Sequence, residues 1–212
     1  IKDDVKSVRA LLDAGGDSNY ALPSGSKVLA VAASHRSLAT ANALVLAGAD
    51  PNVADSAGNT PLHMAAQLGN SELAANLLKK GANPNAKTSP ASGGQRRAVG
   101  QLTPLHAAAS ARHESVLRIL AAHGADPLLD AQDNTTLLLF AAQSGSAGVV
   151  RYVYENLDPR IGAVSSTGRG VLNHAAMGTA GAKPEEICDA IRFLAAHGAK
   201  PAGKPMPQCS TN

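Results

Sequence analysis

A segment of about 33 residues recurs along this chain, and this repetition restricts the fold more than any other feature. The first marker of the repeat is a glycine that opens the motif Gly-Ala-Asp-Pro-Asn or a variant of it, at Gly15, Gly48, Gly81 and Gly124. The second marker is a leucine, at Leu29, Leu62, Leu105, Leu138 and Leu172. Both series keep nearly the same spacing throughout, except for one longer interval that ends at Gly124 in the first and at Leu105 in the second. Two markers that share a period and an insertion indicate a stack of similar units, none of which can bury its apolar face alone.

Two of the units begin almost identically. Residues 60–66 read Thr-Pro-Leu-His-Met-Ala-Ala, and residues 103–109 read Thr-Pro-Leu-His-Ala-Ala-Ala. Threonine is a good helix N-cap and proline suits the first helical position, so each segment predicts the start of a short inner helix. An outer helix is predicted over residues 71–80 and 114–123, where apolar side chains recur at helical spacing. Gly81 and Gly124 come next, and we expect both to have the positive φ of a left-handed C-terminal residue.

On these residues the chain resembles the ankyrin repeat family, whose signature is Thr-Pro-Leu-His-x-Ala once in each repeat of this length. The resemblance covers nearly the whole chain and implies an all-α fold, an ankyrin-type α-solenoid of helix-turn-helix repeats with β-turn fingers. We expect one domain over residues 1–199, with six units at 1–20, 21–53, 54–86, 99–129, 132–162 and 166–199. Residues 87–100 lengthen one finger, and residues 200–212 form a proline-rich tail that is predicted to be extended.

Two units depart from the repeat in ways that matter for stability. Unit one retains only its outer helix, over about residues 4–14, so it exposes an apolar face unless preceding polypeptide or a partner covers that face. Unit five has Thr-Leu-Leu-Leu at 136–139, without the proline and histidine, and Leu157 takes the place of the terminal glycine. Because leucine does not readily adopt the left-handed conformation, unit five is predicted to be the weakest joint.

The composition and the polar motifs argue against catalysis by this chain. A net charge of +3 without a clustered basic face does not indicate nucleic-acid binding, and no stretch approaches the roughly 20 apolar residues of a membrane span. No carboxylate pair, catalytic triad or cluster with metal-ligand spacing emerges, so we predict no catalytic, cofactor-binding or metal residues. The resemblance implies that His63 and His106 brace the turns between repeats. His123 and His197 end outer helices, where they are expected to cap the helix dipole.

Cys188 and Cys209 are the two cysteines of the chain. The first lies on the last outer helix, and the tail that follows this helix could bring the second back across it. The sequence leaves their pairing open, because a disulfide is favoured in an exported protein and disfavoured in a reducing cytosol. The compartment itself is unknown, since both a cytoplasmic protein and one exported after removal of a signal agree with the sequence.

The resemblance implies that a partner contacts the concave surface formed by fingers and inner helices. The residues free to vary there are Ser56, Ala57, Asn59, Gln67 and Leu68 in unit three, Leu102 and Ser110 in unit four, Gln132, Asp133, Thr135 and Gln143 in unit five, and Arg169 in unit six. Leu68 and Leu102, together with Met177 in unit six, are expected to be exposed on this surface. The insertion adds Arg96 and Arg97; it is either a solvated loop or a protruding finger for an acidic partner.

Two functions follow from this pattern. The first is a non-enzymatic module that binds a protein partner, one with an acidic surface if the insertion takes part. The second is an accessory or regulatory subunit, or a fragment, of a larger enzyme complex, with an exported complex among the alternatives. The sequence does not identify the partner in either case.

Overall fold

The computed structural model describes residues 4–90, 100–179, 181–201 and 209. Over this part of the chain, eleven α-helices and one 3₁₀ helix form, and extended pairing is limited to the isolated bridges Ala21–Lys27 and Val164–Gly170. The helices are α1 (Val5–Asp13), α2 (Val28–Ser34), α3 (Leu38–Leu46), α4 (Pro61–Leu68), α5 (Ser71–Lys79), α6 (Pro104–Ser110), α7 (Glu114–Ala122), η1 (Gln132–Asn134), α8 (Leu137–Ser144), α9 (Ala147–Asn156), α10 (Val171–Met177) and α11 (Pro184–Ala196).

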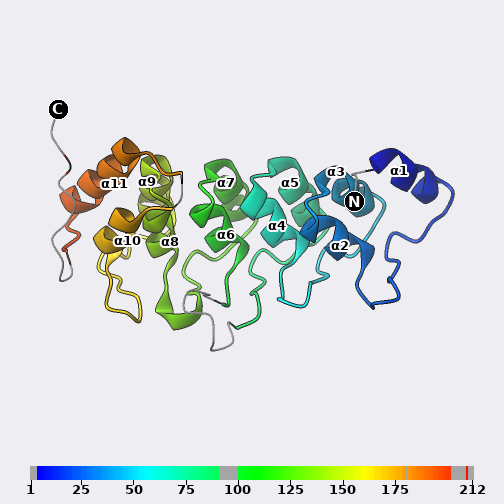
Figure 1. The fold of residues 1–212 in the computed structure, drawn as a ribbon, viewed down its shortest axis with the longest axis horizontal. Coiled ribbons are helices and arrows are strands. Elements are labelled where there is room, and N and C mark those ends of the chain that lie inside the picture. Colours follow the sequence, from blue (N-terminus) through cyan, green and yellow to red (C-terminus); the bar gives the residue numbers. More distant parts are fainter. Residues whose placement is uncertain (1–3, 91–99, 180, 202–208, 210–212) are drawn as a thin grey trace.

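The helices form two rows along an elongated molecule (Figure 1). Inner helices α2, α4, α6 and α8 each contact the next inner helix, and these four and α10 each contact the outer helix that follows them in the chain. Outer helices α1, α3, α5, α7, α9 and α11 form the second row, and the fingers project on the side away from it. The predicted all-α solenoid of six units, the first of them partial, is confirmed.

The inner helices begin as their sequences predict. In α4, the hydroxyl of Thr60 accepts a hydrogen bond from the backbone N–H of His63 at 3.4 Å. The imidazole Nδ1 of His63 accepts in return from the backbone N–H of Thr60 at 3.2 Å. This reciprocal capping satisfies two N–H groups that a helix start otherwise leaves unpaired.

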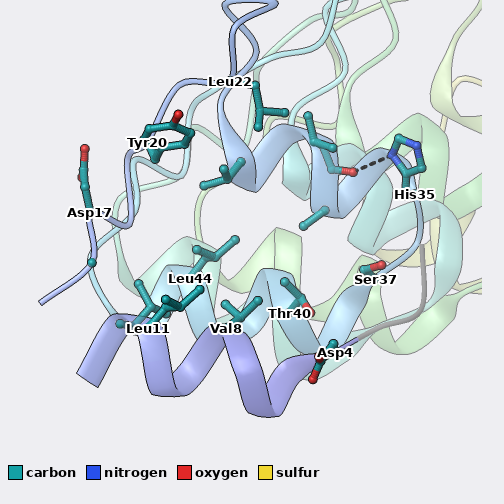
Figure 2. Close-up of a pocket in the computed structure, with 15 residues that line it drawn as sticks. Asp4, Val8, Leu11, Asp17, Tyr20, Leu22, His35, Ser37, Thr40 and Leu44 are labelled. Atoms are coloured by element: carbon teal, nitrogen blue, oxygen red, sulfur yellow. Dashed lines mark hydrogen bonds between the residues drawn. The ribbon is translucent and has the colours of Figure 1, made fainter. Parts of the chain in front are cut away.

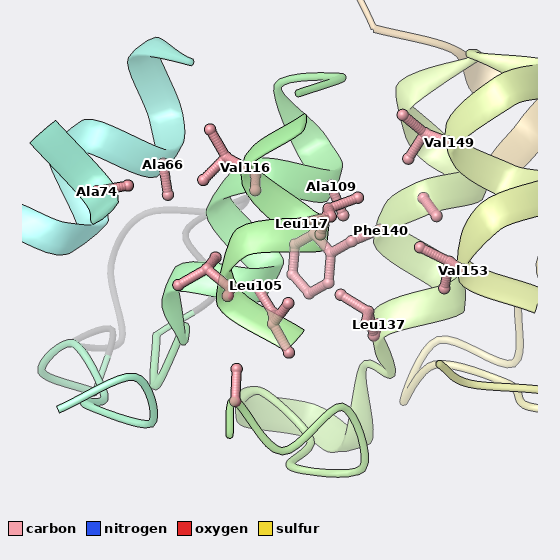
Figure 3. Packing of buried hydrophobic residues seen from close by; sticks show 14 of the residues in the cluster. Ala66, Ala74, Leu105, Ala109, Val116, Leu117, Leu137, Phe140, Val149 and Val153 are labelled. Carbon is pink, nitrogen blue, oxygen red and sulfur yellow. The ribbon is translucent and has the colours of Figure 1, made fainter. Parts of the chain in front are cut away.

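The core consists of leucine, valine and alanine side chains from successive units (Figure 3). Ala65 and Ala66 of α4 and Ala108 and Ala109 of α6 are all 0% exposed. Small side chains at these positions let neighbouring inner helices approach closely, while leucines from the outer helices fill the remaining space. Phe140, which Figure 3 shows among the aliphatic side chains, is a buried aromatic residue in this otherwise mostly aliphatic core.

The ends of the outer helices show where the repeat is regular and where it changes. Gly81 and Gly124 have φ values of 88° and 80°, as predicted. Leu157 does not take this left-handed conformation and has φ of −124°. The backbone after α9 therefore differs from that after α5 and α7. Asp158 occupies the repeat position that is alanine in units three and four, at Ala82 and Ala125.

A ladder of asparagines joins the turns of units one to four along one edge. The side chain of Asn52 donates to the carbonyl of Gly81 at 3.0 Å and accepts from the backbone N–H of Asn83 at 2.7 Å. The same pair of bonds is made one unit earlier by Asn19 and one unit later by Asn85. The position that follows in the next turn is Leu128, which is exposed, so the ladder ends there.

Replacement of Asn52 by alanine is expected to lower the free energy of unfolding by about 1–2 kcal/mol, because two hydrogen bonds between units are lost. Urea unfolding measures this change. The matched control is Asn156→Ala, since the exposed Asn156 side chain bonds only to the carbonyl of Tyr152 in its own helix. Equal destabilisation by both variants would show that the hydrogen bonds of Asn52 between units add no more stability than a bond within one helix.

The disulfide between Cys188 and Cys209 settles the pairing that the sequence leaves open. The two Cα atoms are 5.5 Å apart, and Cys209 packs against the core beside α11. Cys209 in the tail therefore lies against the last unit. The prediction that residues 200–212 are extended falls mainly on residues outside the described part.

Candidate binding surface

The base of the insertion connects the fingers of three units. The backbone N–H of Thr88 donates to the carbonyl of Leu102 at 3.0 Å, and the N–H of Leu102 donates to the hydroxyl of Thr88 at 3.0 Å. The two ends of the insertion are thus held together. Residues 91–99, with Arg96 and Arg97, lie outside the described residues.

This base also contacts the fingers on either side. The N–H of Ser89 donates to the carbonyl of Ala57 at 2.9 Å, in the finger of unit three. The N–H of Gln132, in the finger of unit five, donates to the carbonyl of Gly100 at 2.9 Å. Backbone hydrogen bonds therefore tie the fingers of units three, four and five into one platform.

Predicted contact residues at equivalent positions form a row at the ends of the inner helices. Gln67 is the penultimate residue of α4, Ser110 is the last residue of α6, and Gln143 is the penultimate residue of α8. Gln67 is exposed, and Ser110 and Gln143 are half-buried. Because α4, α6 and α8 pack side by side, these polar side chains lie on consecutive units of the same face.

The tip of the unit-three finger presents Ser56 and Ala57, both exposed. Its shape is maintained by Asp55, whose carboxylate accepts from the backbone N–H groups of Ala57 and Asn59 at 2.9 Å each. The Asn59 side chain donates to the same carboxylate at 3.0 Å. Asn59 therefore stabilises the turn, although the sequence predicts it as a contact residue.

Two predictions about exposure are wrong, and one predicted contact residue is buried. Leu68 and Leu102 are half-buried, and Leu102 packs against the core. Thr135, at the position of unit five equivalent to Leu102, is 6% exposed. Both residues precede the N-cap threonine of an inner helix, where the chain turns inward between fingers. Thr135 is consequently too buried to contact a partner in this arrangement.

The remaining predicted residues lie at the edges of the platform. Gln132 is half-buried in η1, and the side chain of its neighbour Asp133 is outside the described part of the structure. Arg169 is exposed in unit six, with its Nη1 3.8 Å from the sulfur of Met177. Met177 is 49% exposed, as predicted.

The histidines of the two Thr-Pro-Leu-His segments serve the structure. Nε2 of His63 lies 2.9 Å from the carbonyl of Leu102. Because Nδ1 accepts from the backbone N–H of Thr60, the ring proton is on Nε2, which donates to this carbonyl. His63 therefore connects α4 to the finger of the next unit, as the family resemblance implies. His123 caps its helix as predicted, with Nδ1 2.8 Å from the carbonyl of Ile119.

His106 is the most deeply buried of these side chains. It is 1% exposed, its Nδ1 accepts from the backbone N–H of Thr103 at 3.1 Å, and Phe140 lies edge-on with the ring centres 4.9 Å apart. Among the described residues its Nε2 has no hydrogen-bond partner. Burial, with a smaller effect from the charge of Lys87, lowers the pKa of His106 to about 3. Burial also lowers the pKa of His63.

The stack is expected to lose stability as the pH falls from about 6.5 toward 3. In this range the unfolded chain protonates His106 near its ordinary pKa of 6.5, whereas the buried imidazole stays neutral to about 3. The unfolded state binds more protons, so acid favours it. Urea unfolding at pH 7 and pH 4.5 measures the loss, which should be smaller in His106→Gln than in the parent. The exposed His123→Gln is the control, and an equal reduction in both variants would contradict this assignment.

Sequence reasoning missed an ionic network that holds the fingers around unit five. The buried carboxylate of Asp158 accepts from the backbone N–H of Leu138 at 3.1 Å and from Nε of Arg160 at 2.7 Å. Arg160 also contacts Asp130 at 2.8 Å, and the ammonium of Lys87 donates to the carbonyl of Asp130 at 3.1 Å. This network replaces the proline and histidine that unit five lacks, so the structure gives that unit a brace of different chemistry.

Within the described residues, no group of three or more His, Cys, Asp or Glu side chains could hold a metal ion. No helix in that part of the chain is long and apolar enough to cross a membrane. The features that the described part does show are a row of polar side chains at the ends of α4, α6 and α8 and the hydrogen-bonded fingers beside them.

The comparison with known families agrees with this geometry. A family model described as ankyrin repeats in three copies matches residues 1–88 and 93–163. The chain therefore belongs to the ankyrin repeat family, whose members generally act as protein–protein interaction modules and are typically not enzymes. The search of curated proteins gives no match.

Proposed function

We propose that this chain is a non-enzymatic module that binds a protein partner through the face formed by the fingers and inner helices of units three to five. The observation that carries the proposal is the platform made by the fingers, where the insertion base bonds to Ala57 on one side and to Gln132 on the other. The contact residues retained from the sequence are Ser56, Ala57, Gln67, Ser110, Gln132, Asp133 and Gln143, with Arg169 at one edge and Arg96 and Arg97 at the rim.

The chemistry of this face suits recognition of another protein. Its side chains are mostly uncharged and polar, with alanine among them, and polar and apolar contacts mix in this way in interfaces that are not permanent. A rigid backbone beneath them limits the entropy lost on binding. Three adjacent units can present the roughly 800 Å² that one partner contributes to an interface of standard size.

The arginines of the insertion would act mainly on the rate of encounter. Charges at the rim of an interface steer an oppositely charged partner and affect association more than dissociation. We therefore expect the double variant Arg96→Glu, Arg97→Glu to slow association and to flatten its dependence on salt. An unchanged association rate at low salt would assign the insertion to the solvated loop.

Site-specific photo-crosslinking tests the proposed face even while the partner is unidentified. A photoreactive amino acid at Gln67 or Ser56, both exposed on the proposed face, should give a discrete crosslinked product in an extract of the source cells. The matched positions are Arg118 and Arg151, which are exposed on outer helices α7 and α9. Crosslinks only from the outer helices would overturn the proposal.

A further inference from the structure

The disulfide between Cys188 and Cys209 joins helix α11 to a residue 21 positions later in the chain. Cys188 lies in the N-terminal half of α11, and both cysteines are half-buried. Helix α11 stands at the end of the row of outer helices, where it packs against α9 (Figure 1). The bond lies outside units three to five, so its role is independent of the function proposed above.

The repeat register shows on which side of α11 this bond lies. Cys188 occupies the same repeat position as Ser71, as the spacing from each residue to the glycine that ends its outer helix shows. The hydroxyl of Ser71 donates to the hydroxyl of Ser115, in the next outer helix, at 3.1 Å. Cys188 therefore faces the side on which the next outer helix packs in the earlier units.

A second pair of units gives the same geometry. Glu114 occupies this repeat position in unit four, and a Cβ added to Gly148 of the next outer helix, α9, would lie 3.4 Å from its carboxylate. Cys209 packs against the core beside Cys188. Cys209 thus lies where the first turn of a following outer helix lies in units four and five.

Helix α11 is held in the stack from its other side. Ala190 and Leu194 are 0% exposed, Ile191 is 8% exposed, and the helix packs against α9 and α10. These helix contacts do not depend on Cys209, so cleavage of the disulfide should leave α11 in place. Because both cysteines are half-buried, a small thiol can reach their sulfurs through local opening, without unfolding of the whole stack.

We propose that the bond between Cys188 and Cys209 is a redox switch, which covers one side of α11 when oxidised and uncovers it when reduced. The reductant is a dithiol. Its first thiolate attacks one sulfur of the disulfide, so a mixed disulfide forms and the other cysteine leaves as a thiolate. Its second thiol then attacks the mixed disulfide and releases the remaining cysteine. Two electrons pass to the protein, the dithiol becomes a disulfide, and its two protons end on Cys188 and Cys209.

Reduction is expected to act locally on unit six. A disulfide restricts the open states of the chain that it closes into a loop, so its loss makes local opening easier. Backbone amides of α11 should therefore exchange with deuterium faster in the reduced chain, by a factor of roughly ten or more. Helices α4 and α6 should keep their exchange rates, because repeat units contact only their neighbours.

Hydrogen–deuterium exchange of the full chain with and without dithiothreitol tests the proposal, together with alkylation by N-ethylmaleimide followed by mass spectrometry. The oxidised chain should take up no maleimide. After dithiothreitol it should take up two, while its helical circular dichroism stays unchanged. The variant Cys209→Ser should show the faster exchange of α11 without dithiothreitol. The same variant is the matched control for the reagent, since dithiothreitol should not change its exchange further.

Three results would overturn the proposal. The first is reduction of the disulfide only at urea concentrations that unfold the whole stack, because the bond would then be purely structural. The second is equal exchange of α11 in the oxidised and reduced chains, which would show that Cys209 covers nothing that opens. The third is a chain that, after equilibration with oxidised glutathione, carries free thiols or glutathione on both cysteines instead of the bond between them.

Discussion

Replacement of Asp158 by alanine is expected to lower the free energy of unfolding by about 2–4 kcal/mol, although Asp158 is not one of the predicted contact residues. The carboxylate is 0% exposed and takes hydrogen bonds from the backbone of α8 and from the guanidinium of Arg160. Without it, the N–H of Leu138 and part of the Arg160 guanidinium lose their partner in a buried place. Urea or thermal unfolding measures the change.

The matched control for this prediction is Asp189→Ala. Asp189 also pairs with an arginine, Arg192, but at 3.6 Å and with both side chains more than half exposed. Exposed pairs contribute little, so this variant should stay within about 0.5 kcal/mol of the parent. If Asp158→Ala is as mild as the control, the brace assigned to unit five does not exist and the unit is held by apolar packing alone.

Gly145→Val is expected to be comparably severe, at about 2–5 kcal/mol, for two reasons that add. Gly145 ends α8 with φ of 72°, a conformation that costs an ordinary residue about 1–2 kcal/mol. In addition, a Cβ at this position would lie 2.8 Å from the Cβ of Ala182 and 3.0 Å from Cγ1 of Ile187, so unit six would have to shift. Overpacking of this kind adds about 1–3 kcal/mol.

Gly124→Val separates the two contributions. Gly124 has φ of 80°, and among the described residues, apart from its two neighbours in the chain, no atom lies within 4 Å of the place where its Cβ would be. This variant should therefore show the conformational cost alone and be clearly less destabilised than Gly145→Val. Equal losses would indicate that the contact of Gly145 with Ala182 and Ile187 of unit six is not tight.

Much of the fold follows from short-range patterns in the sequence. Threonine and proline at 60–61 and 103–104 define where two inner helices begin, and the glycines at 81 and 124 define where outer helices end. Each of these assignments depends on one residue type and its nearest neighbours. Such local rules are readable from one sequence.

Longer-range interactions are not readable in this way. Asn52 looks like an ordinary turn residue, and only the recurrence of asparagine after proline in two units, at Asn52 and Asn85, hints that it bonds to the next turn. Asp158 looks like a surface acid, because its network with Arg160 and Asp130 forms only when two fingers come together in the fold. Charged side chains are rarely predicted as buried unless their partners are known.

The candidate binding surface is predictable in position but less so in exposure. The repeat register correctly places Gln67, Ser110 and Gln143 on successive inner helices. It cannot show that the residue before each N-cap threonine is drawn inward, as Leu102 and Thr135 are, since this depends on how neighbouring fingers bond to each other. The sequence predicts an exposed apolar face beside α1, and Figure 2 shows Val8 and Leu11 of this helix beside an apolar pocket.

Hydrogen–deuterium exchange of the chain with and without its crosslinked partner tests the central claim most directly. The proposed function predicts slower exchange on binding in the fingers at residues 54–59, 100–102 and 131–135 and at the ends of α4, α6 and α8, with no change in α5, α7 and α9. Slower exchange confined to the outer helices α5, α7 and α9 would contradict it, because the partner would then contact the opposite side of the stack.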